Sequence, residues 1–150
     1  MADAVPTPTP TYAIIAGFGV PGRAVAEFLE SHGLSYAVIE TNPCTVQNAR
    51  KSGRRMVAGD ATDSRVLHEA GIETASLLVV AIPHEPSALA VTRQARRMNP
   101  NVRIITRTHF TSVGMEAKHV GANEVVVAEQ VVAFAFCQIL QNQSATFPCK

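Results

Sequence analysis

Residues 17–22 read GFGVPG and match the pattern G-x-G-x-x-G. Gly17 would allow a tight turn, Gly19 would let a pyrophosphate approach the backbone, and Gly22 would let a helix pack closely on a strand. Pro21 fits the first helical turn, where its missing N–H costs nothing. Free N–H groups and the positive end of a helix dipole would then face the phosphates. The pattern alone is weak evidence, so its interpretation as a phosphate-binding loop depends on the residues around it.

An acidic residue that could hold a ribose is Glu40, at the end of the second expected strand. Its carboxylate can accept hydrogen bonds from both ribose hydroxyls. It also disfavours NADP, because a carboxylate repels a 2′-phosphate. Arg50, Arg54 and Arg55 could in principle offset this repulsion, but they are interpreted as solvated charges. The alternative is a tight turn and an unrelated surface glutamate. Strand, loop, helix and acid occur in the required order, which favours an adenine-nucleotide site.

Residues that could support catalysis are scattered along the chain. No histidine lies at metal-ligand spacing from Cys, Asp or Glu, although His84 and His109 follow strand ends. No serine sits in a nucleophile elbow, and no Lys-Ser/Thr pair completes a Walker pattern. Cys44, at a helix start, is interpreted as inert. We therefore expect no catalytic residues and no metal, and a dehydrogenase would also need a substrate domain beyond these 150 residues.

Short apolar runs alternate with helical patterns over most of the chain. The strands are expected at residues 12–16, 36–40, 55–58, 77–82, 103–107 and 124–127. The helices are expected at residues 21–32, 43–52, 64–70, 86–98, 112–119 and 130–141. Asn42 before Pro43 predicts a capped helix start. Six alternating β–α units predict an α/β fold: a Rossmann-like, doubly wound, parallel six-stranded sheet with helices on both faces.

Composition and charge narrow the class of protein. Hydrophobic residues make up 47% of the chain and charged residues 17%, which is typical of a folded domain. The net charge of +1 predicts no nucleic-acid partner. An odd number of cysteines and no signal peptide favour a cytoplasmic location. We expect a linker over residues 1–10, one domain over residues 11–141 and an irregular tail over residues 142–150.

Three segments together resemble the RCK/KTN (TrkA-N) family of cytosolic nucleotide-binding domains. They are GFGVPGR from Gly17, VAGDATDSRVLHEAGIETASLLVVAIP from Val57, and RTHFTSVGMEAKHVGANEVVVAEQ from Arg107. The GDAT-D…L…AGI part is the most specific. The resemblance covers about residues 11–141. It implies control of potassium channels, potassium uptake systems or Kef-type cation/proton antiporters.

The resemblance also implies roles for individual residues. Asp60 and Ala61 would border the adenine, Ala81 and Ile82 would line the cleft, and Arg107 would reach a phosphate or the second half of a dinucleotide. Many antiporter-type members carry a basic residue where this chain has Val20, and the nearest substitute is Arg23. The predicted nucleotide-binding set is Gly17, Phe18, Gly19, Val20, Pro21, Gly22, Arg23, Glu40, Thr41, Asp60, Ala61, Ala81, Ile82 and Arg107.

The last expected helix is apolar around most of its circumference, which predicts burial on all sides. We expect the protein to form a homodimer that is held largely by this helix. Members of the resembled family also pair as dimers. The function expected is a regulatory domain that senses NAD(H) or AMP/ATP and controls a membrane-embedded potassium channel or cation/proton antiporter from the cytosolic face of the inner or plasma membrane. The alternative is a small NAD-dependent oxidoreductase or a fragment of one. A redox-sensing transcription regulator lacks support, because the chain has no recognition helix or basic stripe.

Overall fold

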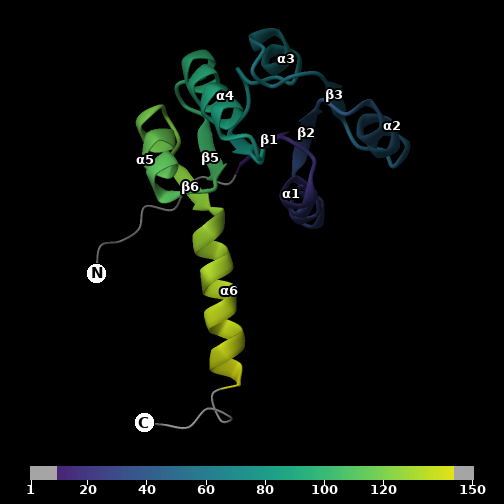
Figure 1. Cartoon of the computed structure of the whole chain (residues 1–150). Coiled ribbons are helices and arrows are strands. Elements are labelled where there is room, and N and C mark those ends of the chain that lie inside the picture. Colours follow the sequence, from purple (N-terminus) through teal and green to yellow (C-terminus); the bar gives the residue numbers. More distant parts are fainter. Residues whose placement is uncertain (1–9, 144–150) are drawn as a thin grey trace, which may run out of the picture.

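The computed structural model describes residues 10–143, in which strands and helices alternate (Figure 1). Most of the predicted linker and tail lies outside these residues. The strands are β1 Tyr12–Ala16, β2 Ser35–Glu40, β3 Met56–Ala58, β4 Leu77–Val80, β5 Arg103–Thr108 and β6 Glu124–Val127. The helices are α1 Val20–Ser31, α2 Pro43–Lys51, α3 Ser64–Glu69, α4 Glu85–Met98, α5 Thr111–His119 and α6 Ala128–Asn142.

The six strands form one parallel sheet in the order β3-β2-β1-β4-β5-β6. The chain builds outward from β1 to β3 and then crosses back to place β4 beside β1. The order therefore reverses between β1 and β4, which in a doubly wound sheet is where ligands bind. The predicted Rossmann-like fold is confirmed.

The helices divide between the two faces of the sheet. One core joins Ile14, Leu78 and Ile104 of the strands to α3 and α4. The other joins Ile15 and Val38 to α1 and α2. Because α5 packs beside α4 against β5 and β6, helices α3–α5 share one face. The central strands β1, β2 and β4 are mostly apolar because most of their residues are buried, although Val79 of β4 is only half-buried.

Side-chain caps define two helix starts next to the sheet edge. Asn42 accepts hydrogen bonds from the N–H groups of Cys44 and Thr45, which confirms the predicted cap of α2. At α4 the ring of His84 accepts from the N–H of Ser87, so this helix begins one residue before the expected position. Both helices start close to the carboxyl ends of the strands.

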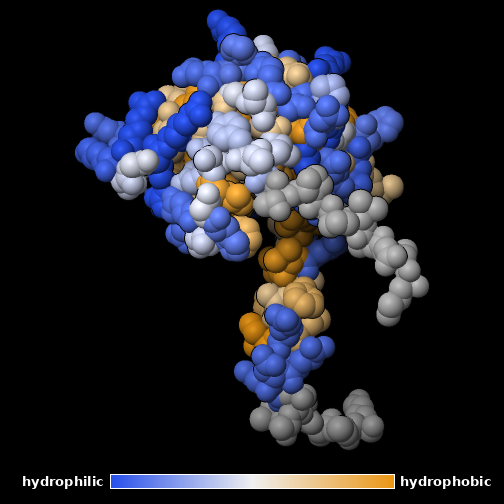
Figure 2. Space-filling view, turned by 180° about the vertical axis from the view of Figure 1, so that it is seen from behind, coloured by the Kyte–Doolittle hydropathy of each residue, from blue (hydrophilic) through white to orange (hydrophobic). Residues whose placement is uncertain are grey.

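Helix α6 leaves the rest of the molecule and projects outward (Figure 1). None of its residues is buried; Phe134 is 63% exposed and Phe136 is 64% exposed. Figure 2 shows the hydrophobic surface over the part of α6 nearest the body, with polar residues at its far end. The helix includes Asn142, which was expected in the tail. Among the described residues, no helix is long and apolar enough to cross a membrane.

Candidate functional site

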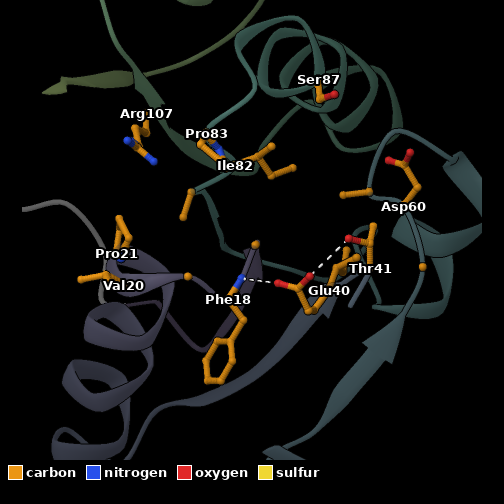
Figure 3. Close-up of a pocket in the computed structure, with 16 residues that line it drawn as sticks. Phe18, Val20, Pro21, Glu40, Thr41, Asp60, Ile82, Pro83, Ser87 and Arg107 are labelled. Carbon is orange, nitrogen blue, oxygen red and sulfur yellow. Dashed lines mark hydrogen bonds between the residues drawn. The ribbon is translucent and has the colours of Figure 1, made fainter. Parts of the chain in front are cut away.

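A pocket of about 790 Å³ opens at the carboxyl ends of the strands, over the point where β1 and β4 part (Figure 3). Its size is that of a small-molecule site. The residues that line it are Gly17, Phe18, Gly19, Val20, Pro21, Ile39, Glu40, Thr41, Gly59, Asp60, Ala61, Ala81, Ile82, Pro83, Ser87 and Arg107. Twelve of the fourteen predicted residues are among them; Gly22 and Arg23 are not.

The three glycines of the loop have different physical reasons to be glycine. Gly17 has a φ of +97°, which side chains rarely adopt. A Cβ on Gly22 would lie 2.0 Å from the carbonyl oxygen of Gly17, so only glycine allows the loop to pack on the helix. A Cβ on Gly19 would meet no atom within 4 Å, which leaves open space above the backbone. No side chain caps α1, so its N-terminal dipole faces this space.

Glu40 ties the second strand to the glycine loop. Its Oε2 accepts a hydrogen bond from the N–H of Phe18 at 2.9 Å, and its Oε1 accepts from the N–H of Asn42 at 2.9 Å. Partial burial by itself raises the pKa of the Glu40 carboxyl. Hydrogen bonds from Asn42, Phe18 and Thr41 outweigh burial, so the pKa lies below its ordinary value. The carboxylate is therefore ionised at neutral pH and held at the pocket wall.

Asp60 lies across the pocket from Arg107 (Figure 3). Its Oδ1 accepts hydrogen bonds from both the N–H and the hydroxyl of Thr62 at 2.8 Å, so it forms a turn as well as facing the pocket. Ala61 beside it is buried and contributes an apolar wall. Such a wall suits the flat face of a base.

Charge is distributed unevenly around the pocket. Arg107, at the end of β5, is half-buried and is the one cation that lines the pocket in the described part of the chain. Arg23 lies outside, because its Nε donates to the carbonyl of Phe18 and its guanidinium stands 5.5 Å from the Phe18 ring. In the structure Arg23 thus lies beside Phe18 and is not among the residues that line the pocket.

The comparisons with known proteins agree with this geometry. Residues 13–128 match the TrkA-N domain. The chain belongs to the TrkA-N domain family. It is 30% identical over 141 residues, 94% of this chain, to the putative cation/proton antiporter YbaL of Escherichia coli, of which it spans 25%. Its fold overlays the TrkA-N domain of YbaL with a TM-score of 0.83 at 30% identity, covering 88% of this chain and 98% of that one.

Two further proteins are similar to this chain over most of its length. A putative K⁺ efflux antiporter, KefB of Alkalimonas amylolytica, is 34% identical over 77% of this chain, which spans 17% of KefB. The structure of GsuK bound to ADP has a TM-score of 0.78 at 26% identity, covering 88% of this chain and 34% of that one. The TrkA-N domain thus forms only a part of each of these longer relatives.

Four pocket residues of this TrkA-N domain were not predicted: Ile39, Gly59, Pro83 and Ser87. Ile39 and Gly59 adjoin the predicted Glu40 and Asp60, so their place at strand ends was a usable signal. Pro83 and Ser87 enter because β4 ends at Val80, two residues earlier than expected, and α4 then starts against the pocket. Among the described residues, no cluster of His, Cys, Asp or Glu is placed to hold a metal ion.

Proposed function

We propose that this chain is a regulatory domain that binds an adenine nucleotide, NAD(H) or AMP/ATP, in the pocket at the carboxyl edge of the sheet. The observation that carries the proposal is the convergence of an uncapped helix start, open space above Gly19, and an ionised Glu40 on one pocket. Phosphates suit the helix start and a ribose suits the carboxylate. The ADP bound to the related GsuK supports a ligand of this class.

The charges of the pocket favour a ligand with few phosphates. Glu40 and Asp60 face one guanidinium, that of Arg107. Each further phosphate adds negative charge against two carboxylates, and the described residues that line the pocket offer it no second side-chain cation. NAD(H) and AMP are therefore favoured over ATP, and Glu40 disfavours the 2′-phosphate of NADP.

The proposed partner is a cation transport protein at the cytoplasmic face of a membrane. The relatives YbaL and KefB are named as a putative cation/proton antiporter and a putative K⁺ efflux antiporter. In this role the nucleotide would shift the domain between two arrangements by binding one of them more tightly. The transporter would respond to that shift.

We also propose that two copies of the domain pair through α6. On the face covered by α1 and α2, the half of the sheet formed by β4–β6 has no helix over it among the described residues. Val79 and Ile105 are only half-buried there, and Val126 is 46% exposed. Val79, Ile105 and Val126 form an apolar strip on this face beside the Arg103–Glu124 ion pair, and an apolar helix with no buried residue could cover that strip. Helix α6 of a second copy would cover this face.

The alternative function is that of a small NAD-dependent oxidoreductase. Mass spectrometry of the nucleotide released from the purified full chain tests binding, and turnover of NAD with a panel of small alcohols tests catalysis. We expect a bound adenine nucleotide and no turnover above the buffer control. Turnover would support the oxidoreductase, and a failure to bind any adenine nucleotide would contradict both functions.

A further inference from the structure

A carboxylate lies next to the pocket without lining it. Glu85 is the first residue of α4 and lies between Pro83 and Ser87, which both line the pocket (Figure 3). Its Oε1 accepts a hydrogen bond from the N–H of His109 at 2.6 Å and a longer one from the N–H of Phe110 at 3.4 Å. The side chain is 21% exposed. Glu85 therefore joins the pocket rim to the turn between β5 and α5.

The same turn holds the start of α6. The carbonyl of His109 accepts a hydrogen bond from the N–H of Glu129 at 3.3 Å, and the hydroxyl of Thr111 accepts from Nε2 of Gln130 at 3.0 Å. Glu129 and Gln130 lie in the first turn of α6. A continuous set of hydrogen bonds thus leads from Glu85 through one turn to the base of the projecting helix.

Few contacts orient α6 on its own domain. Since no residue of α6 is buried, packing does not determine its direction. Within one copy of the chain, its orientation depends on its covalent link to β6 and on the hydrogen bonds of its first turn. A shift of the turn at His109 would therefore change the direction in which α6 leaves β6.

We propose that Glu85 is a positioning residue that couples occupancy of the pocket to the orientation of α6. This rests on the proposed nucleotide binding. A nucleotide that contacts Pro83 and Ser87 restricts the start of α4, and Glu85 moves with that segment. The turn at His109 follows through its N–H, and α6 follows through the N–H of Glu129. The nucleotide shifts the helix only if it binds one arrangement better than the other.

Hydrogen–deuterium exchange of the full chain tests this coupling, with calorimetry used to choose whichever of NAD and AMP binds more tightly. The amides to follow are those of His109, Phe110 and Glu129. Four proteins are compared: the natural chain, Glu85→Ala, Glu85→Gln and Glu116→Ala. Gln keeps an oxygen that accepts from the N–H of His109. Glu116 is an exposed glutamate within α5 and serves as the matched control.

In the natural chain we expect the nucleotide to slow exchange at these amides by about threefold or more, as local opening becomes rarer. Glu85→Ala should bind the nucleotide with nearly unchanged affinity but lose this slowing. Glu85→Gln and Glu116→Ala should keep it. A variant that was merely unfolded would lose binding as well, so retained affinity separates coupling from stability.

Two results would overturn the coupling alone: bound nucleotide with no slowing at these amides in the natural chain, or full slowing in Glu85→Ala. Loss of the slowing in Glu116→Ala would also overturn it, because the effect would not be specific to Glu85. If neither NAD nor AMP bound the natural chain, the proposed function itself would be contradicted and the coupling would fall with it.

Discussion

Glu40 has two roles, one in holding the glycine loop and one in facing the ligand pocket. Its carboxylate holds the turn after β1 through the N–H of Phe18, and it presents its remaining oxygen lone pairs to the pocket. Arg107 lies at the other side of the same pocket. One carboxylate therefore contributes both to folding and to the choice of ligand.

Replacing Glu40 with Ala removes the acceptor for the ribose hydroxyls. A hydrogen bond to a charged group contributes about 1.5–3 kcal/mol, so NAD should bind roughly ten- to a hundredfold more weakly by calorimetry. Glu27→Ala, at an exposed position on α1, should bind like the natural chain. The natural chain should bind NADP more weakly than NAD, and the reverse order would overturn the role of Glu40.

Glu40 also contributes to stability in a pH-dependent way. Its pKa is lowered in the folded state from an ordinary value of 4.5, so the stabilisation is present at neutral pH and is lost as the pH falls below about 4.5. Glu40→Gln lacks this titration. The free energy of unfolding in urea should therefore differ most between the two proteins at pH 7, and the gap should narrow in acid. A gap that widened in acid would contradict this assignment.

Among the elements, the end of α4 is held by a buried amide. Asn99 donates from Nδ2 to the carbonyls of Ile72 and Ala75, and its Oδ1 accepts from the N–H groups of Asn101 and Val102. It is 8% exposed. One side chain thus ties the end of α4 to the segment before β4 and to the start of β5.

Replacing Asn99 with Ala removes these four hydrogen bonds. The carbonyl of Ile72 keeps the N–H of Ala75 and the N–H of Val102 keeps the carbonyl of residue 99, but the carbonyl of Ala75 and the N–H of Asn101 lose the partner described above. Each buried unsatisfied group costs about 1–3 kcal/mol, so we expect a loss of at least 2 kcal/mol in the free energy of unfolding. Asn48→Ala, on the exposed side of α2, should change it by less than about 0.5 kcal/mol. Equal stabilities of the two variants in urea would show that Asn99 does not hold α4.

All twelve elements could be predicted from the alternation of apolar runs and helical patterns. Their ends could not always be predicted. Strand β4 ends at Val80, opposite Ala16 of β1 and Thr106 of β5, and only the N–H of Ala81 still bonds to the carbonyl of Ala16 beyond that point. Asn99 could not be predicted, since its partners lie in a loop far away in sequence. Arg23 was expected at the phosphates because sequence spacing does not reveal that its side chain turns to Phe18.

The exposed position of α6 indicates that two copies of the chain associate. Its exposed apolar side chains include Val131, Phe134, Phe136, Ile139 and Leu140. Burying each contributes roughly 1.5–3 kcal/mol, which together can exceed the cost of association.

Sedimentation velocity should therefore show a dimer for the intact chain. A chain that ends at Glu129 should remain folded by circular dichroism, because α6 buries nothing on its own domain. That shorter chain should sediment as a monomer. A monomeric intact chain would contradict dimerisation, and a dimeric shorter chain would place the interface elsewhere.

If an adenine nucleotide binds over the glycine loop, the variant Gly19→Leu should abolish that binding. A side chain at this position meets open space and an ordinary φ of −75°, so the variant should melt close to the natural chain. The same side chain would occupy the space in which a phosphate must lie. Calorimetry with NAD and with AMP should show binding to the natural chain and none to Gly19→Leu. Unchanged affinity in the variant would contradict nucleotide binding over the glycine loop.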